Sequence, residues 1–118
     1  MKQIFLTTLL AITLTGCSLL PRDHDPIMVD KWVDIGVAIE QVECGRDPGD
    51  RGWSEVEDLA NRLAIYTEFR DDPQKANIRG LQEHARKMAQ GGSIKFCDLG
   101  KKSAQSRLNA ARSAWSGR

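Results

Sequence analysis

The chain has 118 residues, of which 41% are hydrophobic and 28% are charged, and its formal net charge is +1. This length suits one small domain and leaves no room for a second sizeable core. The composition is that of an ordinary folded chain rather than a disordered one. The near-zero net charge lacks the strong positive balance of nucleic-acid-binding domains, so no nucleic-acid partner is expected.

The first sixteen residues have the features of an export signal. A short segment with one positive charge, Met1-Lys2-Gln3, precedes eleven mostly apolar residues from Ile4 to Leu14. The apolar run is too short to cross a membrane, because a spanning helix needs about 20 apolar residues. A charged start, a short apolar core and small residues at its end are typical of a secretory signal peptide, which we predict at residues 1–16.

The residues Leu14-Thr15-Gly16-Cys17 resemble the bacterial lipobox. In proteins with this motif, signal peptidase II cuts before the cysteine, whose thiol and new amino group are then lipidated. The resemblance implies that Cys17 begins the mature protein and that its acyl chains hold residues 17–24, a lipidated tether, to a membrane facing the periplasm. Ser18 stands where enterobacterial lipoproteins retained in the inner membrane have aspartate, which favours the outer membrane. The alternative is a buried N-terminal helix with a core cysteine.

Residues 25–118 are predicted to form one all-α domain, an antiparallel bundle of three to four helices. Asp25-Pro26 is typical of an N-cap followed by proline at the first helical position. Apolar residues then recur at helical spacing on a helix that we expect to end near Cys44-Gly45. These residues are Met28, Trp32, Ile35, Ile39 and Val42.

Three further helices follow in the prediction. The second opens at Ser54, which forms a capping box with Glu57, and the third opens at Asp72-Pro73 and ends at Gly91-Gly92. The fourth lies between about Phe96 and Trp115, although Gly100 lowers its helix propensity. The predicted core stripes are Val56, Leu59, Leu63 and Tyr66 with Phe69 alongside, then Ile78, Leu81, Ala85 and Met88, then Cys97, Ala104, Leu108, Ala111 and Trp115.

The remaining two cysteines support an up-down-up-down topology. In that arrangement the first helix ends, and the fourth begins, at the same end of the bundle, where Cys44 and Cys97 lie. An oxidising periplasm favours a disulfide between them, worth about 4 kcal/mol from loop-closure entropy. Two free buried thiols are the alternative. A metal site is disfavoured, because no CxxC and no further ligand with convincing spacing accompanies the pair.

Charge divides along the chain. Residues 17–72 contain 14 acidic and 6 basic side chains, whereas residues 73–118 contain 10 basic and 2 acidic ones. The simpler interpretation is an acidic first hairpin packed against a basic second hairpin. The other is a bipolar surface on which Lys101, Lys102, Arg107 and Arg112 meet an acidic protein, anionic headgroups or lipopolysaccharide phosphates.

Residues suited to catalysis are scarce. His24 lies between Asp23 and Asp25, a pattern that in principle binds a divalent cation or moves a proton, but we interpret Asp25 as a helix cap and its neighbours as solvated tether. His84 falls off the third apolar stripe and is predicted to be exposed. No nucleophile, metal or phosphate-binding motif has a supporting context, so we predict a non-enzymatic chain without a cofactor or metal.

Trp53 and Arg51 are the predicted partner contacts at the outward end, together with Lys101 and Lys102. Trp53 stands at the mouth of the loop from Gly45 to Gly52, and an exposed tryptophan beside an arginine is a plausible anchor for a partner. The alternative is that Trp53 covers the end of the bundle. The opposite, membrane-proximal end is expected to hold the lipid, the Arg70-Asp71-Asp72 turn and the C-terminus.

The segments PRDHDP, DDPQ, KFC and the terminal AWSGR also resemble small lipoproteins of bacteriophages and prophages. That resemblance names no activity. By analogy it implies either superinfection exclusion, in which the lipoprotein occludes an outer-membrane receptor, or an outer-membrane lysis component, which fits less well because such subunits are proline-rich and this chain has four prolines. A binding or structural module of the host envelope and an inhibitor of a periplasmic enzyme fit the same residues.

Overall fold

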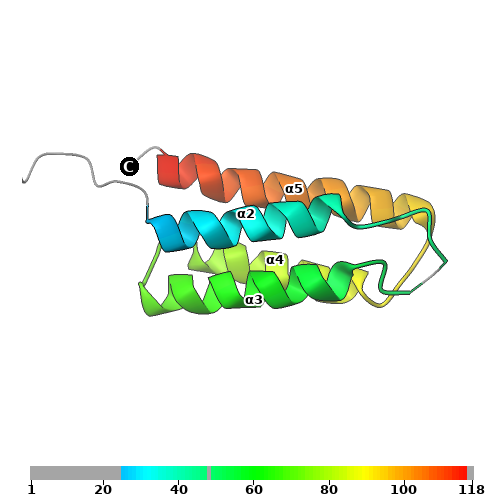
Figure 1. Cartoon of the computed structure of the whole chain (residues 1–118), viewed down its shortest axis with the longest axis horizontal. Helices are drawn as coiled ribbons and strands as arrows, with labels where there is room; N and C mark the ends of the chain where they lie inside the picture. The colour runs from blue at the N-terminus through cyan, green and yellow to red at the C-terminus, as the bar shows by residue number, and fades with distance from the viewer. Residues whose placement is uncertain (1–24, 48, 117–118) are drawn as a thin grey trace, which may run out of the picture.

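The computed structural model describes residues 25–47 and 49–116, and over these ranges it is all-α. Its helices are α2 (Pro26–Glu40), α3 (Trp53–Phe69), α4 (Lys75–Met88) and α5 (Ile94–Ser116). Consecutive helices run in opposite directions (Figure 1). The predicted antiparallel helical bundle is therefore confirmed, with four helices. None of these four helices is long and apolar enough to cross a membrane.

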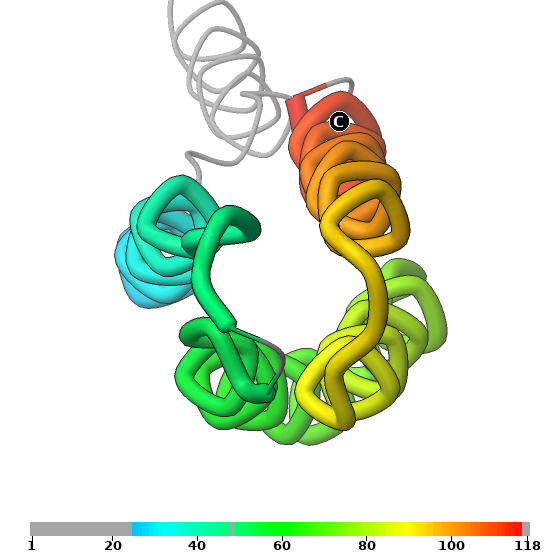
Figure 2. Tube along the Cα trace, turned by 90° about the vertical axis from the view of Figure 1, so that its right-hand side faces the viewer, coloured from blue at the N-terminus to red at the C-terminus, as the bar shows by residue number. Residues whose placement is uncertain are grey.

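The helices follow one another around the bundle in chain order (Figure 2). Packing is most extensive between α3 and α4 and sparsest between α2 and α5, which close the ring. We call the end at which α2 starts and α5 finishes the proximal end, and the end that holds the α2–α3 and α4–α5 connections the distal end (Figure 1).

One hydrophobic core runs along the bundle axis. Ile35, Leu63, Ile78 and Leu81 are fully buried in it, as the apolar spacing predicts. Trp32, Leu59, Tyr66 and Trp115 are only partly buried and pack against the edge of the core. Phe69, which we expected alongside the second stripe, is instead 87% exposed, because it lies on the face of α3 opposite the core.

The start of α2 agrees with the prediction and its end does not. The Asp25 carboxylate accepts hydrogen bonds from the backbone N–H groups of Ile27 and Met28, as an N-cap does. The helix ends at Glu40, four residues before Cys44. Beyond it the chain turns, and the Glu43 N–H donates to the Arg51 carbonyl across the loop, so Val42 and Cys44 are buried outside the helix.

The next two helix starts also differ from the prediction. The capping box at Ser54 is wrong: α3 begins at Trp53, with Gly52 at the N-cap in the left-handed conformation (φ 99°), and the Asp50 carboxylate accepts from the backbone N–H groups of Gly52 and Ser54. Helix α4 begins at Lys75 rather than directly after Asp72-Pro73, because the Asp72 carboxylate accepts from Gln74 N–H in a turn before the helix. In both cases an aspartate caps from outside the helix.

Helix α5 continues without interruption through Gly100. A Cβ at this position would lie 2.3 Å from Cε of Met88 on α4. The glycine therefore lets Met88 pack directly on the α5 backbone, which offsets the low helix propensity of glycine.

Candidate functional site

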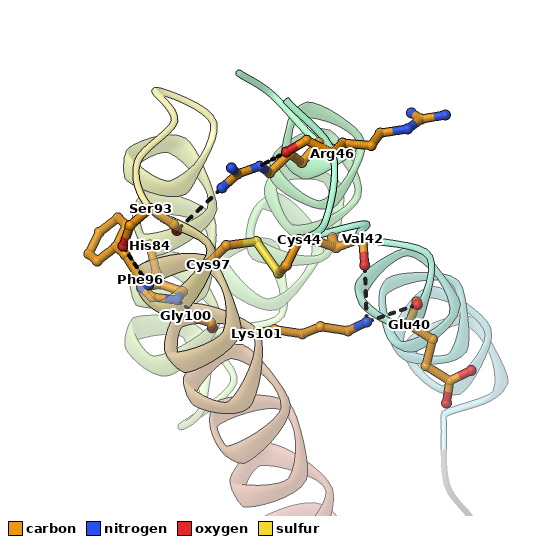
Figure 3. Close-up of a disulfide and its surroundings, with 11 residues drawn as sticks. Glu40, Val42, Cys44, Arg46, His84, Ser93, Phe96, Cys97, Gly100 and Lys101 are labelled. Atoms are coloured by element: carbon orange, nitrogen blue, oxygen red, sulfur yellow. Dashed lines mark hydrogen bonds between the residues drawn. A yellow bond between two sulfur atoms is a disulfide. The ribbon is translucent and has the colours of Figure 1, made fainter. Parts of the chain in front are cut away.

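A disulfide closes the distal end of the bundle (Figure 3). Cys44 and Cys97 are bonded with a Cα–Cα distance of 5.5 Å, across a sequence separation of 53 residues. Both cysteines are buried. The predicted pairing is confirmed, and it ties the chain that follows α2 to the second turn of α5.

Trp53 is a core residue, so the prediction that it is exposed for a partner is wrong. Its side chain is completely buried, and its ring meets that of His84 edge-on at a centroid distance of 6.0 Å. Within the described residues, no acceptor lies within hydrogen-bond distance of its buried Nε1–H. The alternative expectation holds: because α3 starts at Trp53 itself, the indole points into the bundle and plugs its distal end.

Arg51 is also buried, although we predicted it as a partner contact. Its Nε donates to the Arg46 carbonyl at 3.3 Å, and its Nη1 donates to the Ser93 carbonyl at 3.4 Å. The guanidinium thus links the α2–α3 loop to the start of α5. The guanidinium is therefore bonded to backbone carbonyls and is not available on the outer surface.

The two predicted lysines have different roles. The Lys101 ammonium donates to the carbonyls of Glu40 (3.1 Å) and Val42 (3.0 Å), as Figure 3 shows. It therefore caps the C-terminus of α2 from a neighbouring helix, where a cation also suits the helix dipole. Lys102 is exposed. Of the four predicted partner contacts, Lys102 is exposed, Lys101 is half-buried, and Trp53 and Arg51 are buried.

His84 is half-buried, which corrects the prediction that it is exposed. Its Nε2 lies 2.9 Å from the Gly100 carbonyl, to which it donates. Together with its ring contact to Trp53, this bond makes His84 a structural residue between α4 and α5.

The distal surface that remains open is a patch of apolar and basic side chains that sequence reasoning missed. Phe96 and Leu99 are about half exposed and line a shallow hollow of about 360 Å³ between α4 and α5, with Lys87 at its edge. Lys95 and Lys102 lie one turn on either side of Leu99. We call these five residues the distal patch. The Phe96 ring lies on the side of α5 away from the disulfide (Figure 3).

A signal for the distal patch was present in the sequence. Phe96 and Leu99 both fall off the stripe of Cys97, Ala104 and Leu108, so two large apolar residues had no place in the predicted core. Apolar side chains without a core position, beside lysines, are the pattern of an exposed binding surface.

Ion pairs between α3 and α4 join acidic residues of the first half of the chain to basic residues of the second half. Arg79 binds Glu68 at 2.7 Å, and Arg86 binds Glu57 at 3.1 Å. The acidic first hairpin and the basic second hairpin thus face each other across this interface, as the simpler interpretation predicted. Both pairs are partly exposed, so each adds little stability, but they favour this pairing of the hairpins over others.

Polar contacts close the proximal end. The Tyr66 hydroxyl donates to Asp25 Oδ2 at 2.6 Å, and Arg70 Nη1 lies 2.9 Å from the same oxygen. The Tyr66 hydrogen bond is the main cause that lowers the pKa of Asp25, and the Ile27 and Met28 N–H groups and Arg70 lower it further while burial opposes them. The hydrogen bond with Tyr66 and the nearby Asp25 carboxylate raise the pKa of Arg70. Asp25 therefore caps α2 and joins it to the end of α3.

A second set of contacts at this end joins α5 to the α3–α4 turn. Trp115 Nε1 donates to Asp72 Oδ1 at 3.1 Å. In the same turn Lys75 pairs with Asp71, which lowers the pKa of Asp71 and raises that of Lys75. The Arg70-Asp71-Asp72 turn and Trp115 therefore lie at the proximal end, as the predicted topology requires.

An open groove of about 280 Å³ lies between the N-terminal half of α2 and the last turn of α5. Arg112 is its cationic residue and stacks over the Trp32 ring at 5.9 Å. Trp32 Nε1 donates to the Leu108 carbonyl at 2.9 Å, so its polar atom is satisfied inside the bundle. The groove is mainly apolar and is lined by Asp25, Met28, Val29, Trp32, Val33, Arg112, Trp115 and Ser116.

Several predicted residues lie outside the described ranges. These are the signal peptide at residues 1–16, the lipidation site Cys17, and Asp23 and His24 of the tether. Within residues 25–47 and 49–116, no group of three or more His, Cys, Asp or Glu side chains is arranged to hold a metal ion.

Residues 1–18 match the family defined as the prokaryotic membrane lipoprotein lipid attachment site. The chain is a membrane-anchored lipoprotein. Cys17 is the cysteine within the matched segment, as the lipobox resemblance implied. No curated protein sequence and no solved structure matches the chain. The lipid attachment site precedes α2 in the chain, so the anchor joins the bundle at the proximal end.

Proposed function

We propose that this lipoprotein is a non-enzymatic binding module on the periplasmic face of the outer membrane, and that the distal patch binds an acidic surface of a protein partner. The observation that carries the proposal is the combination in the distal patch of two half-exposed apolar side chains with three exposed lysines. Lys87, Lys95 and Lys102 outnumber the one exposed carboxylate beside Leu99, that of Asp98, and this excess of cations suits a partner with an apolar spot bordered by carboxylates.

The position of the distal patch supports this role. The lipid enters at the proximal end, and α5, with 23 residues, is about 34 Å long. The distal patch therefore lies at the opposite end of a rigid rod from the anchor, where an envelope protein can reach it. The disulfide, Trp53, Arg51 and Lys101 fix the backbone beneath the patch, which reduces the entropy lost on binding.

The shifted pKa values of four side chains have structural causes. Asp25, Arg70, Asp71 and Lys75 owe their shifts to pairs that cap or join helix ends at the proximal end. These shifts have a structural cause, so they do not mark an acid or base poised for proton transfer.

In-cell crosslinking tests the proposal. A photoreactive phenylalanine derivative replaces Phe96 in one variant and Val37 in a matched control, because Val37 is exposed to a similar extent (46% against 49%) but lies on α2 outside the distal patch. We expect one protein to crosslink from position 96 and not from position 37. Adding Lys95→Glu and Lys102→Glu should lower that yield about tenfold, since like charges then oppose each other. Equal yields from both positions would contradict the proposal.

Membrane fractionation tests the location separately. The wild-type protein should be labelled by radioactive palmitate and sediment with the outer membrane, and Cys17→Ser should abolish the labelling. Ser18→Asp should move the protein to the inner membrane, because it introduces the residue typical of lipoproteins that are retained there. If wild-type protein sediments with the inner membrane, the outer-membrane assignment is wrong, whereas the binding role of the distal patch is unaffected.

A further inference from the structure

Large exposed hydrophobic side chains gather at the two ends of the bundle. Three of them, Ile94, Phe96 and Leu99, lie at the start of α5 at the distal end. Most of the others are within about two helical turns of the proximal end, on α2 and α3. This second group consists of Ile27, Val29, Val33, Ile65 and Phe69. The distal patch contains Phe96 and Leu99 of the first group, and no role has been assigned to the second group.

Phe69 is the most exposed member of the proximal group. It lies in the last turn of α3, and its ring is 87% accessible. The next residue, Arg70, is held by Asp25 and also approaches the Tyr66 ring at 6.0 Å. The backbone at Phe69 is therefore fixed by contacts within the bundle, while the phenyl ring is exposed to solvent.

The groove between α2 and α5 adds two tryptophans to the same end. The indole N–H groups of Trp32 and Trp115 bond to Leu108 and Asp72, so their apolar ring faces are what the groove presents. Arg112 stacks on Trp32 at the groove. Tryptophan rings with an arginine beside them are typical of the headgroup level of a bilayer, where the ring is buried and the cation meets phosphate.

Three of the carboxylates at the proximal end are bonded within the bundle, whereas Asp30, which is exposed beside Val29, takes part in none of the ion pairs among the described residues. Asp25 is bonded by Tyr66 and Arg70, Asp71 by Lys75, and Asp72 accepts from Trp115 and Gln74.

The length of the chain between the lipid and the bundle decides what covers this surface. Eight peptide steps separate Cys17 from Asp25, which at full extension span at most about 29 Å. The start of α2 is therefore always within that distance of the bilayer that holds the acyl chains. A tether of this length makes contact with the same bilayer an intramolecular event, so modest apolar area is sufficient.

We propose that the proximal face, defined as Ile27, Val29, Val33, Ile65 and Phe69 together with Trp32, Arg112 and Trp115 of the groove, docks on the phospholipid surface in which the protein is anchored. The bundle then stands on the membrane, with apolar side chains at headgroup level and Arg112 at the phosphates. This inference does not depend on a protein partner for the distal patch.

Fluorescence quenching in reconstituted vesicles tests the orientation. The lipidated full-length mature protein is placed in vesicles of phosphatidylethanolamine and phosphatidylglycerol with brominated acyl chains, which quench tryptophan at the level of the bilayer. Phe69→Trp is compared with Phe96→Trp, a matched variant in which an exposed phenylalanine at the distal end is replaced. The signal of the wild-type protein in the same vesicles, with its three tryptophans, is subtracted from both.

The position-69 tryptophan should be quenched at least about twofold more than the position-96 tryptophan and should emit at shorter wavelength, because only the former enters the interface. Equal quenching at both positions would show a bundle lying flat and would overturn the proposal. Absence of quenching at position 69 would show that the tether holds the bundle away from the bilayer and would overturn it as well. Because no partner is present in the vesicles, failure here leaves the crosslinking result at the distal patch unaffected.

Discussion

The two ends of the bundle are closed by different chemistry. At the distal end a disulfide, a fully buried tryptophan and two cations bonded to backbone carbonyls hold the helices together. At the proximal end the joints are side-chain hydrogen bonds and ion pairs around Asp25 and Asp72, beside an open apolar groove. The distal end is held by a covalent bond and buried groups, whereas the contacts at the proximal end depend on ionised groups near solvent.

This difference agrees with the two proposals, a bilayer at the proximal end and a protein partner at the distal end. A distal end fixed from within leaves its outer side chains free for a partner, and in an oxidising compartment its disulfide persists. A proximal end against a bilayer has a second source of support, because the membrane can cover apolar side chains that the bundle leaves open. The contacts at the two ends should differ in how much they add to the free energy of unfolding and in how that contribution depends on pH.

Removing the disulfide should have the largest effect. In the double variant Cys44→Ala/Cys97→Ala the unfolded chain regains the freedom of a 53-residue separation, so the free energy of unfolding should fall by about 4 kcal/mol. Urea denaturation monitored by circular dichroism measures the change. Wild-type protein treated with dithiothreitol is the control and should lose a similar amount. A loss below about 1 kcal/mol would mean that the distal end is held by Trp53 and its neighbours without the bond.

Patterns of spacing predicted the fold well. Most residues of the predicted stripes, Met28, Ile35 and Ile39 among them, are buried as expected, and the disulfide follows from the topology that they imply. The cap at Asp25 was predictable because the cap and the N–H groups that it binds lie within three residues. Such local and periodic signals survive in a single sequence.

Contacts with residues far away in the sequence determine the positions of the side chains that were predicted incorrectly. The side chain of Lys101 bonds to carbonyls about 60 residues away in the sequence, and that of Arg51 bonds to Ser93. Nothing in the local sequence separates Lys101 from Lys102. Trp53 was misplaced because the helix was expected to begin at Ser54, and the left-handed Gly52 lets it begin one residue earlier. Once Trp53 is part of the helix, it lies one turn before the buried Val56 and therefore on the core face of α3.

Breaking the proximal joint should have an intermediate effect that depends on pH. Tyr66→Phe removes the hydroxyl that bonds to the Asp25 carboxylate, and the free energy of unfolding should fall by about 2 kcal/mol at neutral pH, as for other hydrogen bonds to charged groups. The phenyl ring that packs on the core is kept. Chemical denaturation of the wild type and the variant over a range of pH measures the change.

The direction of the pH dependence follows from the lowered pKa of Asp25. A carboxyl whose pKa is lower in the folded state stabilises the fold fully above its unfolded value of about 4, and this contribution is lost as the pH falls through the folded value. The difference between the wild type and Tyr66→Phe should therefore shrink in acid. The cost of removing the disulfide should stay constant over the same range, and an equal pH dependence of the two differences would refute the contrast between the ends.

Lys101→Met should have the smallest measurable effect and tests whether the distal lysine is structural. Methionine retains a long apolar stem but leaves the Glu40 and Val42 carbonyls without the ammonium that bonds to them, at a cost of about 1 kcal/mol in the free energy of unfolding. The neighbouring Lys102→Met is the matched control and should change the stability by less than about 0.5 kcal/mol, because that side chain is exposed. In the crosslinking experiment from position 96 the order should reverse, with Lys102→Met lowering the yield more than Lys101→Met. If Lys101→Met lowers the yield more, Lys101 contacts the partner and the assignment of the two lysines is wrong.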